Sequence, residues 1–288
     1  MGTGMWLANT HRTQENPVTG PSIYDRPRLD FVDCVLIDMD GVLYTGTDVL
    51  PGARELFEKL HLRGLKYSLV TNNATLTPAQ YVEKLAGMGI QVPESTVFTS
   101  SLATSLYLRQ IEPEGAPVYV IGESGLREAL AGAGFWIDEN RPKYVCVGLD
   151  RHLTYERLAA ATLAIRAGAG FIATNPDTTL PTERGIVPGV GSILAALVAA
   201  TGVHPRVIGK PEPDMFNICV DLHGVSKERT LVIGDRLETD IAAGANAGLF
   251  TTLVLTGIST LGEVADSPYQ PDLIVDNLAE LTTLLGSS

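Results

Sequence analysis

The chain has 288 residues, of which 45% are hydrophobic and 19% charged, and this composition suits one large globular domain or two ordinary ones. Its formal net charge of -12, from 21 Lys plus Arg against 33 Asp plus Glu, opposes the phosphate neutralisation on which duplex binding depends, so we expect no nucleic-acid partner. The three cysteines, Cys34, Cys146 and Cys219, are odd in number and far apart, which indicates neither a disulfide framework nor a zinc cluster and favours the cytoplasm.

Residues 1–28 lack the long apolar region of a secretory signal and mix Gly, Pro, Asn and Thr without a period. We expect a flexible N-terminal lead, and the alternative is a short arm packed on the core through Trp6 or Tyr24. The most apolar helical stretch, residues 191–203, is shorter than the roughly 20 residues that cross a bilayer, so no membrane segment is predicted.

From about residue 30, short β-branched runs alternate with longer stretches of helical periodicity, which is typical of βα units around a mostly parallel sheet. The predicted strands are residues 34–37, 67–71, 118–121, 144–148, 171–174, 206–208, 230–233, 251–255 and 273–275. The predicted helices are residues 51–64, 77–89, 124–134, 154–168, 213–224 and 238–248. We therefore expect an α/β fold.

Nine strands are many for one simple doubly wound sheet of this length, and the middle of the chain carries its own βα units. We expect two α/β domains, with the second inserted into the first. Residues 29–103 and 189–288 would form one domain and residues 104–188 the other, with Gly- and Pro-containing joints at 111–117 and 182–191.

The stretch "VLIDMDGVLYTG", residues 35–46, places Asp38 and Asp40 at the end of the first predicted strand. Three neighbouring hydrophobic residues before them and a glycine after them indicate a buried strand that ends at Asp38. Open α/β sheets bind their ligands at such strand ends. Taken alone, the pair also has a simpler interpretation as a solvated turn, because Asp is common in loops.

Other predicted strands also end in polar residues. Thr71 and Asn72 follow the second strand, where a hydroxyl and backbone N–H groups could hold phosphate oxygens. Lys210 follows the strand at 206–208, and the prolines beside it fix the direction of a compact positive charge that suits phosphate. Each has a simpler interpretation as a turn or a surface charge, but parallel strands would bring all of them to one edge of the sheet.

Asp235 ends the strand at 230–233, and Asp240 follows about a turn and a half into the next helix, where it could instead interact with the helix dipole. Carboxylates crowded with Asp38 at one sheet edge cannot all stay ionised without a cation. Their oxygen ligands predict a hard divalent metal, with Mg²⁺ as the first choice. The five histidines form no sequence cluster that would favour zinc.

Together these residues resemble the haloacid dehalogenase superfamily of phosphatases, whose four motifs match in order as "DMDGVL", the threonine of "TNN", the lysine of "GKP" and "GDRLETD". The match extends from about residue 33 to the C-terminus. The large insertion after the second motif, and the stretch "TNPDTTLPTERGIVPGVGSI" at 174–193, are similar to the subgroup with a large α/β cap, which contains NagD-like and 4-nitrophenylphosphatase-like enzymes. The resemblance implies a Rossmann-like doubly wound parallel core with an inserted α/β cap.

The resemblance also implies the activity, a Mg²⁺-dependent hydrolysis of small phosphate monoesters. By similarity, Asp38 is the nucleophile that forms an aspartyl phosphate, and Asp40 protonates the leaving oxygen and then activates water. Thr71, the amide of Asn72 and Lys210 would stabilise the charge on the transferring phosphoryl group.

For the metal, the resemblance implies that Mg²⁺ is held by Asp38, the backbone carbonyl of Asp40 and Asp235, while Asp240 supports these ligands. The substrate is left open among phosphoglycolate, pyridoxal phosphate, nucleoside monophosphates and sugar phosphates. Caps of this subgroup often pair subunits, so a homodimer through the cap is also expected.

Within the predicted cap, Asn175, Pro176 and Asp177 follow a strand and predict a rigid turn with polar groups at its tip. The simpler interpretation is a turn capped by its own side chains. Similarity to the family's substrate loop favours a second interpretation, in which Asn175 and Asp177 face the active site and select the leaving group.

Two other classes of protein could use these residues. A phospho-accepting signalling domain also needs a strand-end Asp, Mg²⁺, a hydroxyl and a Lys, but it has no use for a second acid such as Asp40 or for a large insertion. A catalytically silent phospho-ligand-binding protein of the same fold is the other alternative, and the intact motifs count against it.

Overall fold

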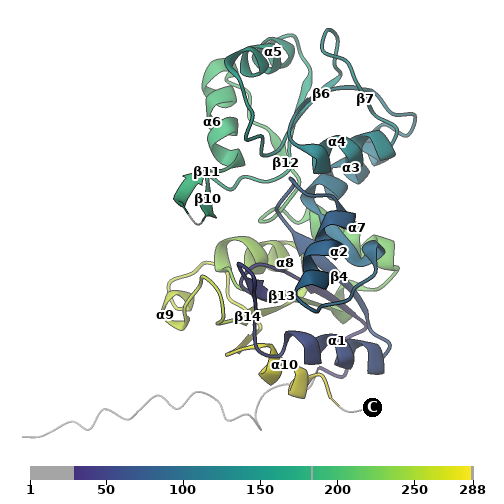
Figure 1. Ribbon diagram of the computed structural model, residues 1–288, viewed down its shortest axis with the longest axis vertical. Coiled ribbons are helices and arrows are strands. Elements are labelled where there is room, and N and C mark those ends of the chain that lie inside the picture. The colour runs from purple at the N-terminus through teal and green to yellow at the C-terminus, as the bar shows by residue number, and fades with distance from the viewer. Residues whose placement is uncertain (1–28, 183, 287–288) are drawn as a thin grey trace, which may run out of the picture.

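The computed structural model describes residues 29–182 and 184–286, which form two large parallel sheets with helices on both faces (Figure 1). The predicted α/β class, a doubly wound core with a second α/β unit inserted in it, is confirmed. The predicted flexible lead, residues 1–28, lies outside the described residues. Within the part of the chain that is described, no helix is both long and apolar enough to cross a membrane.

The larger sheet has six parallel strands in the order β15-β14-β13-β1-β4-β5. In that order their bounds are Leu273–Val275, Phe250–Val254, Thr230–Gly234, Cys34–Ile37, Lys66–Thr71 and Val97–Thr99. The chain builds one half outward from β1 through β4 to β5, and the other half from β13 through β14 to β15. β1 and β13 therefore lie side by side where the winding reverses, which is where open α/β sheets bind ligands.

Helices cover both faces of this sheet. One buried cluster joins α1, α2 and α10 to one face, and a second joins α3, α7 and α8 to the other. Val35 and Ile37 of β1 belong to the first cluster and Cys34 and Leu36 to the second, so β1 is buried on both sides, as its uninterrupted apolar run predicts. The helices of the first cluster are α1 (Ala53–Leu62), α2 (Pro78–Gly87) and α10 (Leu278–Leu284), and those of the second are α3 (Ser100–Ile111), α7 (Asp214–His223) and α8 (Ala242–Ala247). The short helix α9 is Leu261–Val264.

The second sheet has five parallel strands in the order β12-β9-β8-β6-β7 and forms the upper half of Figure 1. In that order their bounds are Arg206–Val207, Gly170–Ala173, Tyr144–Val147, Pro117–Ile121 and Trp136–Ile137. One face packs on α5 (Tyr155–Arg166) and α6 (Val190–Thr201), and the other packs on α4 (Ser124–Gly132). We call this sheet, its three helices and the hairpin described next the cap.

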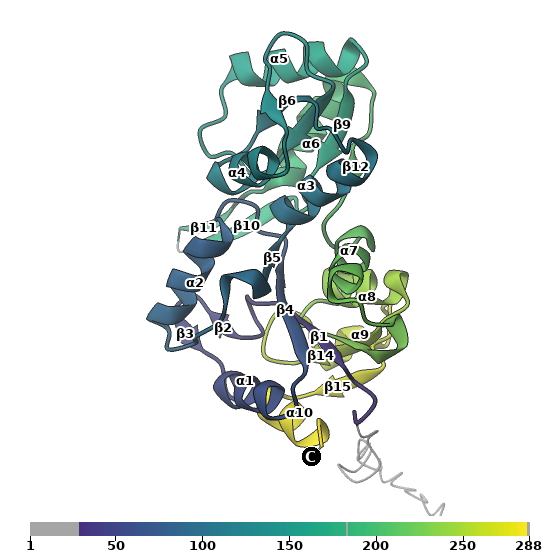
Figure 2. The ribbon, with the colours of Figure 1, turned by 90° about the vertical axis from the view of Figure 1, so that its right-hand side faces the viewer.

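An antiparallel hairpin, β10 (Thr179–Thr182) and β11 (Gly185–Pro188), leaves the cap and lies between the two halves of the molecule (Figures 1 and 2). A smaller hairpin, β2 (Tyr44–Thr45) and β3 (Asp48–Val49), follows β1 in the core. Single helical turns lie at η2 (Glu94–Thr96), η3 (Lys227–Arg229) and η4 (Leu237–Ile241).

Each predicted strand and helix matches an observed element, but the prediction omitted several others, among them β5 and α10. It also omitted α3, which joins the two sheets (Figure 2). Its contact face is polar in sequence, with Ser100, Ser101, Thr104 and Ser105 all buried. These hydroxyls donate to backbone carbonyls, two of them in the loop after β4, so polar residues occupy positions where an amphipathic pattern requires hydrophobic ones.

The domain boundaries predicted at residues 103 and 188 stay predictions. The first falls within α3, whose residues pack against both sheets. At the second, α6 packs on the smaller sheet, and β12 pairs with β9. These contacts favour a cap that extends to about residue 207.

Candidate active site

Asp38 and Asp235 lie side by side because each follows one of the two central strands. The N–H of Asp38 donates to the carbonyl of Ile233 over 2.9 Å and so extends the pairing of β1 with β13 by one residue. Asp235 comes directly after β13. The backbone of the sheet thus fixes where both carboxylates begin, before any contact between the side chains is considered.

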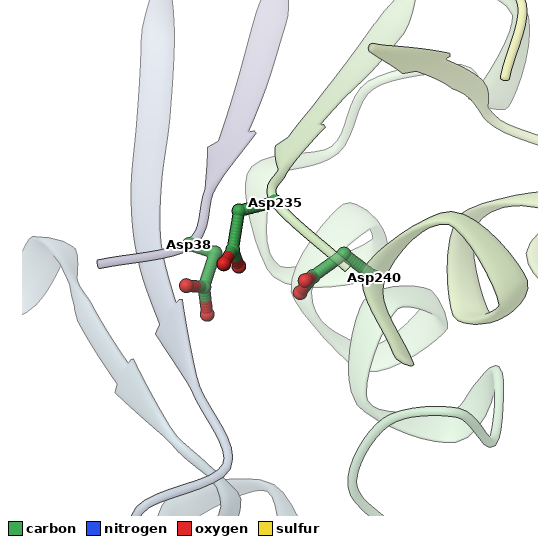
Figure 3. Close-up of side chains that lie close together, drawn as sticks. All are labelled: Asp38, Asp235 and Asp240. Carbon is green, nitrogen blue, oxygen red and sulfur yellow. The ribbon is translucent and has the colours of Figure 1, made fainter. Parts of the chain in front are cut away.

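A third carboxylate, from Asp240, completes an acidic triad with these two (Figure 3). Oxygens of Asp38, Asp235 and Asp240 all lie within 4.8 Å of one another. Asp240 lies in η4, a π-helical turn, and its Oδ2 accepts a hydrogen bond from the N–H of Arg236 over 3.2 Å. Turns of this wide type are frequent at functional sites, since they redirect a side chain within a helix.

Glycines leave room for the carboxylate of Asp235. Its Oδ2 accepts from the N–H of Ile258 over 2.9 Å, which holds the side chain in place. A Cβ added to Gly41 would lie 2.3 Å from the same oxygen, and a Cβ on Gly257 only 2.0 Å from it. Gly41 also has a φ of +83°, a left-handed conformation that favours glycine. The glycine after the paired aspartates is therefore required both by the backbone and by the site.

The ammonium group of Lys210 joins two carboxylates of the acidic triad. Its Nζ donates to Oδ1 of Asp38 over 2.5 Å, to Oδ1 of Asp240 over 2.6 Å and to the carbonyl of Val70 over 3.3 Å. The lysine is only 3% exposed, so these three acceptors replace the water that the ammonium group would otherwise bind.

The positive charge of Lys210 does not balance the negative charges of the three carboxylates in the triad, as the directions of the pKa shifts of Lys210, Asp38 and Asp235 indicate. Burial alone would lower the pKa of Lys210, but the carboxylates of Asp240 and Asp38 raise it overall. Burial raises the pKa of Asp38 well above its usual range against the opposing effect of Lys210, and repulsion from Asp240 and Asp235 adds to the rise. Burial and the nearby Asp240 raise the pKa of Asp235 to about 6. The triad therefore has a deficit of positive charge.

The triad fits a hard divalent cation. All its donors are oxygens, and two ligands of one Mg²⁺ at about 2.1 Å each lie at most about 4.2 Å apart, close to the spacing found here. A cation would also supply the positive charge that the triad lacks. The acidic triad could thus hold Mg²⁺, since an oxygen of Asp240 lies within the same 4.8 Å limit as those of the other two carboxylates.

The loop after β4 lies opposite the triad. Thr71 is buried, and its Oγ1 accepts from the N–H of Asn73 over 3.1 Å. The Asn72 side chain donates from Nδ2 to the carbonyl of Lys210 over 2.8 Å, while its buried Oδ1 has no hydrogen-bond partner among the described residues. The loop thus presents a hydroxyl and backbone N–H groups next to the lysine.

Asp40 has a different environment from Asp38. It is exposed, and its Oδ2 accepts a hydrogen bond from the hydroxyl of Tyr44 over 3.4 Å. Burial and the Asp40 carboxylate raise the pKa of Tyr44, so the phenol keeps its proton and remains a donor. An exposed carboxyl group beside a permanent donor can exchange protons with a bound molecule, whereas Asp38 is held against Lys210.

The cap reaches the same place through the turn after β9. Asp177 Oδ2 accepts from Nδ2 of Asn175 over 2.5 Å and from Nδ2 of Asn72, a core residue, over 3.0 Å. Asn175 is buried, and its Oδ1 accepts from the hydroxyl of Thr174 over 2.7 Å. The cap turn is thus stabilised by its own side chains and also bonded to the core, and selection of the leaving group by Asn175 and Asp177 stays a prediction.

A cavity of about 350 Å³ lies between the core strand ends and the cap, and all nine predicted site residues line it. Their location agrees with the predictions, and their roles stay predictions. The lining also includes eleven residues that the sequence did not single out as site residues, among them Lys84, Arg236, Leu180 and Pro181. Lys84 lies in a helix with an ordinary surface pattern, and the two hairpin residues fall at the edge of a segment interpreted only as a joint.

Comparisons with known proteins agree with this geometry. Residues 35–136 match the haloacid dehalogenase-like hydrolase family, and residues 207–281 match a HAD-hydrolase-like family. An acid sugar phosphatase from Staphylococcus aureus is 44% identical over 246 residues, which cover 85% of this chain and 95% of that protein.

Two solved structures extend the comparison to the fold. A 4-nitrophenylphosphatase from Thermotoga maritima has a TM-score of 0.85 at 38% identity, and the match covers 90% of this chain and 99% of that one. NagD from E. coli K-12 has a TM-score of 0.82 at 36% identity, and the match covers 86% and 98% of the two chains. The similarity therefore includes both the core and the cap.

Proposed function

The chain belongs to the haloacid dehalogenase-like hydrolase family and is a phosphatase, and we propose that it hydrolyses small phosphate monoesters through an aspartyl phosphate on Asp38. One observation carries the proposal. Asp38 ends the central strand at the floor of the cavity, held by Lys210 over 2.5 Å, while a second and exposed acid, Asp40, lies two residues away.

In the first half of the reaction, a carboxylate oxygen of Asp38 attacks phosphorus. The bond between phosphorus and the ester oxygen breaks, and that oxygen takes a proton from the carboxyl group of Asp40 and leaves as an alcohol. The exposure of Asp40 and its contact with the hydroxyl of Tyr44 support this assignment, because the group must meet the leaving oxygen at the open side of the cavity.

In the second half, water attacks the aspartyl phosphate. The Asp40 carboxylate accepts a proton from that water, the bond between phosphorus and the Asp38 oxygen breaks, and inorganic phosphate leaves. Asp38 is then a free carboxylate again and Asp40 is again protonated, so one acid serves both halves. A signalling receiver needs no such second acid, which favours hydrolysis over storage of the phosphoryl group.

Charge on the phosphoryl oxygens is stabilised by the Lys210 ammonium, the Thr71 hydroxyl and the N–H of Asn72. Mg²⁺ bound by Asp38, the Asp40 carbonyl and Asp235 would neutralise the phosphate further, with Asp240 supporting the ligands. The buried hydrogen bonds of Lys210 support this proposal, since they fix the ammonium beside the nucleophile.

For substrates, we propose small phosphorylated metabolites. The S. aureus relative is named an acid sugar phosphatase and the T. maritima neighbour a 4-nitrophenylphosphatase, and both names fit a cavity of this size. Phosphoglycolate, pyridoxal phosphate, nucleoside monophosphates and sugar phosphates remain the candidates. Asn175 and Asp177 are proposed to contact the leaving group from the cap, because both side chains line the cavity.

We also propose a homodimer formed through the cap and a cytoplasmic setting. The edge strand β7 exposes Trp136 and Ile137 by 53% and 50%, and exposed hydrophobic residues on a sheet edge favour pairing with another chain. The three cysteines are free and buried, as a reducing setting requires. Light scattering on the parent and on Trp136→Glu tests the dimer.

The central test is turnover of 4-nitrophenyl phosphate with added Mg²⁺. We expect hydrolysis that EDTA abolishes and added Mg²⁺ restores, because the acidic triad repels phosphate when no cation is bound. No turnover by a folded protein would favour the silent binding alternative. Full activity after exhaustive chelation would contradict the metal assignment alone.

A further inference from the structure

Lys84 lies beside the leaving-group side of the cavity. It belongs to α2, and its Nζ lies 4.1 Å from the centroid of the Tyr44 ring. The hydroxyl of this tyrosine donates to Asp40, the group proposed to protonate the leaving oxygen. Lys84 also lines the cavity itself, so its ammonium group can meet a bound molecule.

The charge of Lys84 has no ionic partner among the residues that the structure describes. The side chain is half-buried, yet no carboxylate of the described residues lies within 4.0 Å of its Nζ. A lysine that has lost part of its water gains from an anionic partner, and the face of an aromatic ring replaces one only in part. Lys210, by contrast, has two carboxylate partners.

The other charged groups in the lining are already engaged or lie elsewhere. Asp177 Oδ2 accepts from two side-chain amides, which reduces its repulsion of an incoming anion. The backbone of Arg236 follows Asp235 directly and so lies beside the acidic triad, and this residue also lines the cavity. Of the β10 residues in the lining, Leu180 and Pro181 are apolar and Thr179 is uncharged. Lys84 is therefore a free positive charge on the side where the alcohol portion of a substrate would lie.

We propose that Lys84 binds an anionic group on the leaving alcohol and so determines specificity. The enzyme would then prefer phosphate esters whose alcohol portion carries a carboxylate or a second phosphate over esters of the same size whose alcohol portion is uncharged. The inference rests on the proposed function, because the leaving-group side is defined by Asp40. Lys84 takes no part in the bond-breaking steps.

The test compares kcat/KM for three small phosphate esters, which are phosphoglycolate, ethylene glycol bisphosphate and ethyl phosphate. The alcohol portion is anionic in the first two and uncharged in ethyl phosphate. We expect Lys84→Gln to lower kcat/KM for an anionic ester by roughly tenfold, as for loss of one charge-assisted hydrogen bond, and to change ethyl phosphate by less than about twofold. Lys84→Arg should keep most of the preference. The two anionic esters show whether the site takes a carboxylate or a phosphate.

Lys227→Gln is the matched control, because Lys227 is exposed on η3 and the variant has the same change in net charge. A specific role for Lys84 predicts parent-like ratios in this control. Equal losses for all three esters in Lys84→Gln, with an unchanged melting temperature, would overturn the proposal, because Lys84 would then act on Asp40 through Tyr44. A preference lost equally in the control would also overturn it.

Failure of the proposed function gives a different result. A parent that hydrolyses neither ethyl phosphate nor 4-nitrophenyl phosphate breaks the proposed function. In that case, calorimetric binding of phosphoglycolate to the parent and to Lys84→Gln still tests the lysine. Weaker binding in the variant supports the proposal, and equal binding overturns it.

Discussion

The core places its site residues at strand ends, whereas the cap reaches the same cavity through a turn and an exposed hairpin. In the core, Asp38 is fixed by strand pairing and Asp235 by contacts with two glycines. In the cap, Asp177 is linked to the core loop by a hydrogen bond from Asn72, and most residues of β10 and β11 are exposed. We infer that the groups proposed for phosphate chemistry are held rigidly, while the cap groups proposed to meet the leaving alcohol can vary.

The strongest test of the rigid half is Asp38→Asn. An amide cannot attack phosphorus, so we expect turnover to fall by on the order of 10⁴-fold or more while the fold is kept. Steady-state hydrolysis of 4-nitrophenyl phosphate and circular dichroism measure the two effects. Substantial residual rate in a preparation free of parent enzyme would show that Asp38 is not the nucleophile.

A second test targets Gly41, whose lack of a side chain leaves room for the carboxylate of Asp235. We expect Gly41→Ala to destabilise the fold by about 1–3 kcal/mol and to lower Mg²⁺-dependent activity roughly 100-fold, since its Cβ would displace a metal ligand. Gly46→Ala is the matched control, because Gly46 also has a positive φ, of +61°, but nothing lies within 4 Å of its added Cβ. Equal activity losses in both variants would leave only backbone strain as the cause.

The variable half is tested by the double variant Asn175→Ala/Asp177→Ala. We expect the ranking of phosphate esters to change, by roughly tenfold for some pairs, while hydrolysis of 4-nitrophenyl phosphate survives. A screen of phosphorylated metabolites measures this, with Asn140→Ala, an exposed cap residue, as the control. If all rates scaled alike, the turn would be structural only.

The smallest expected effect is the pH dependence of Mg²⁺ binding. The pKa of Asp235 is raised from 3.8 to about 6, so the metal-free protein keeps this proton up to about pH 6 and loses stability relative to the unfolded chain as pH rises from about 4 to 6. Mg²⁺ binds the ionised form and must displace this proton at low pH. We expect Mg²⁺ to raise the melting temperature by a few degrees more at about pH 7.5 than at about pH 5. Equal shifts at both values would contradict this linkage.

The same contrast explains what the sequence could predict. Asp38 and Asp235 each follow a short apolar strand directly and Thr71 is the last residue of β4, so local pattern and parallel topology were enough to bring them together. Lys84 was missed because its role depends on Tyr44, which is 40 residues earlier and meets it only in the folded chain. The helix α3 was missed because its buried face carries hydroxyls, two of which donate to carbonyls of a distant loop.

The segment that carries Lys210 belongs to both halves of the molecule. The N–H groups of Ile208 and Gly209 donate to the carbonyls of Ala173 and Thr174 over 3.0 and 2.8 Å, so this segment continues the edge of the cap sheet. One residue later, the side chain of Lys210 holds two carboxylates of the core. A rotation of the cap that keeps these two hydrogen bonds would therefore displace Lys210 along with the cap sheet. For the ammonium to stay on Asp38 during such a motion, the hinge would have to lie at Gly209 or beyond it.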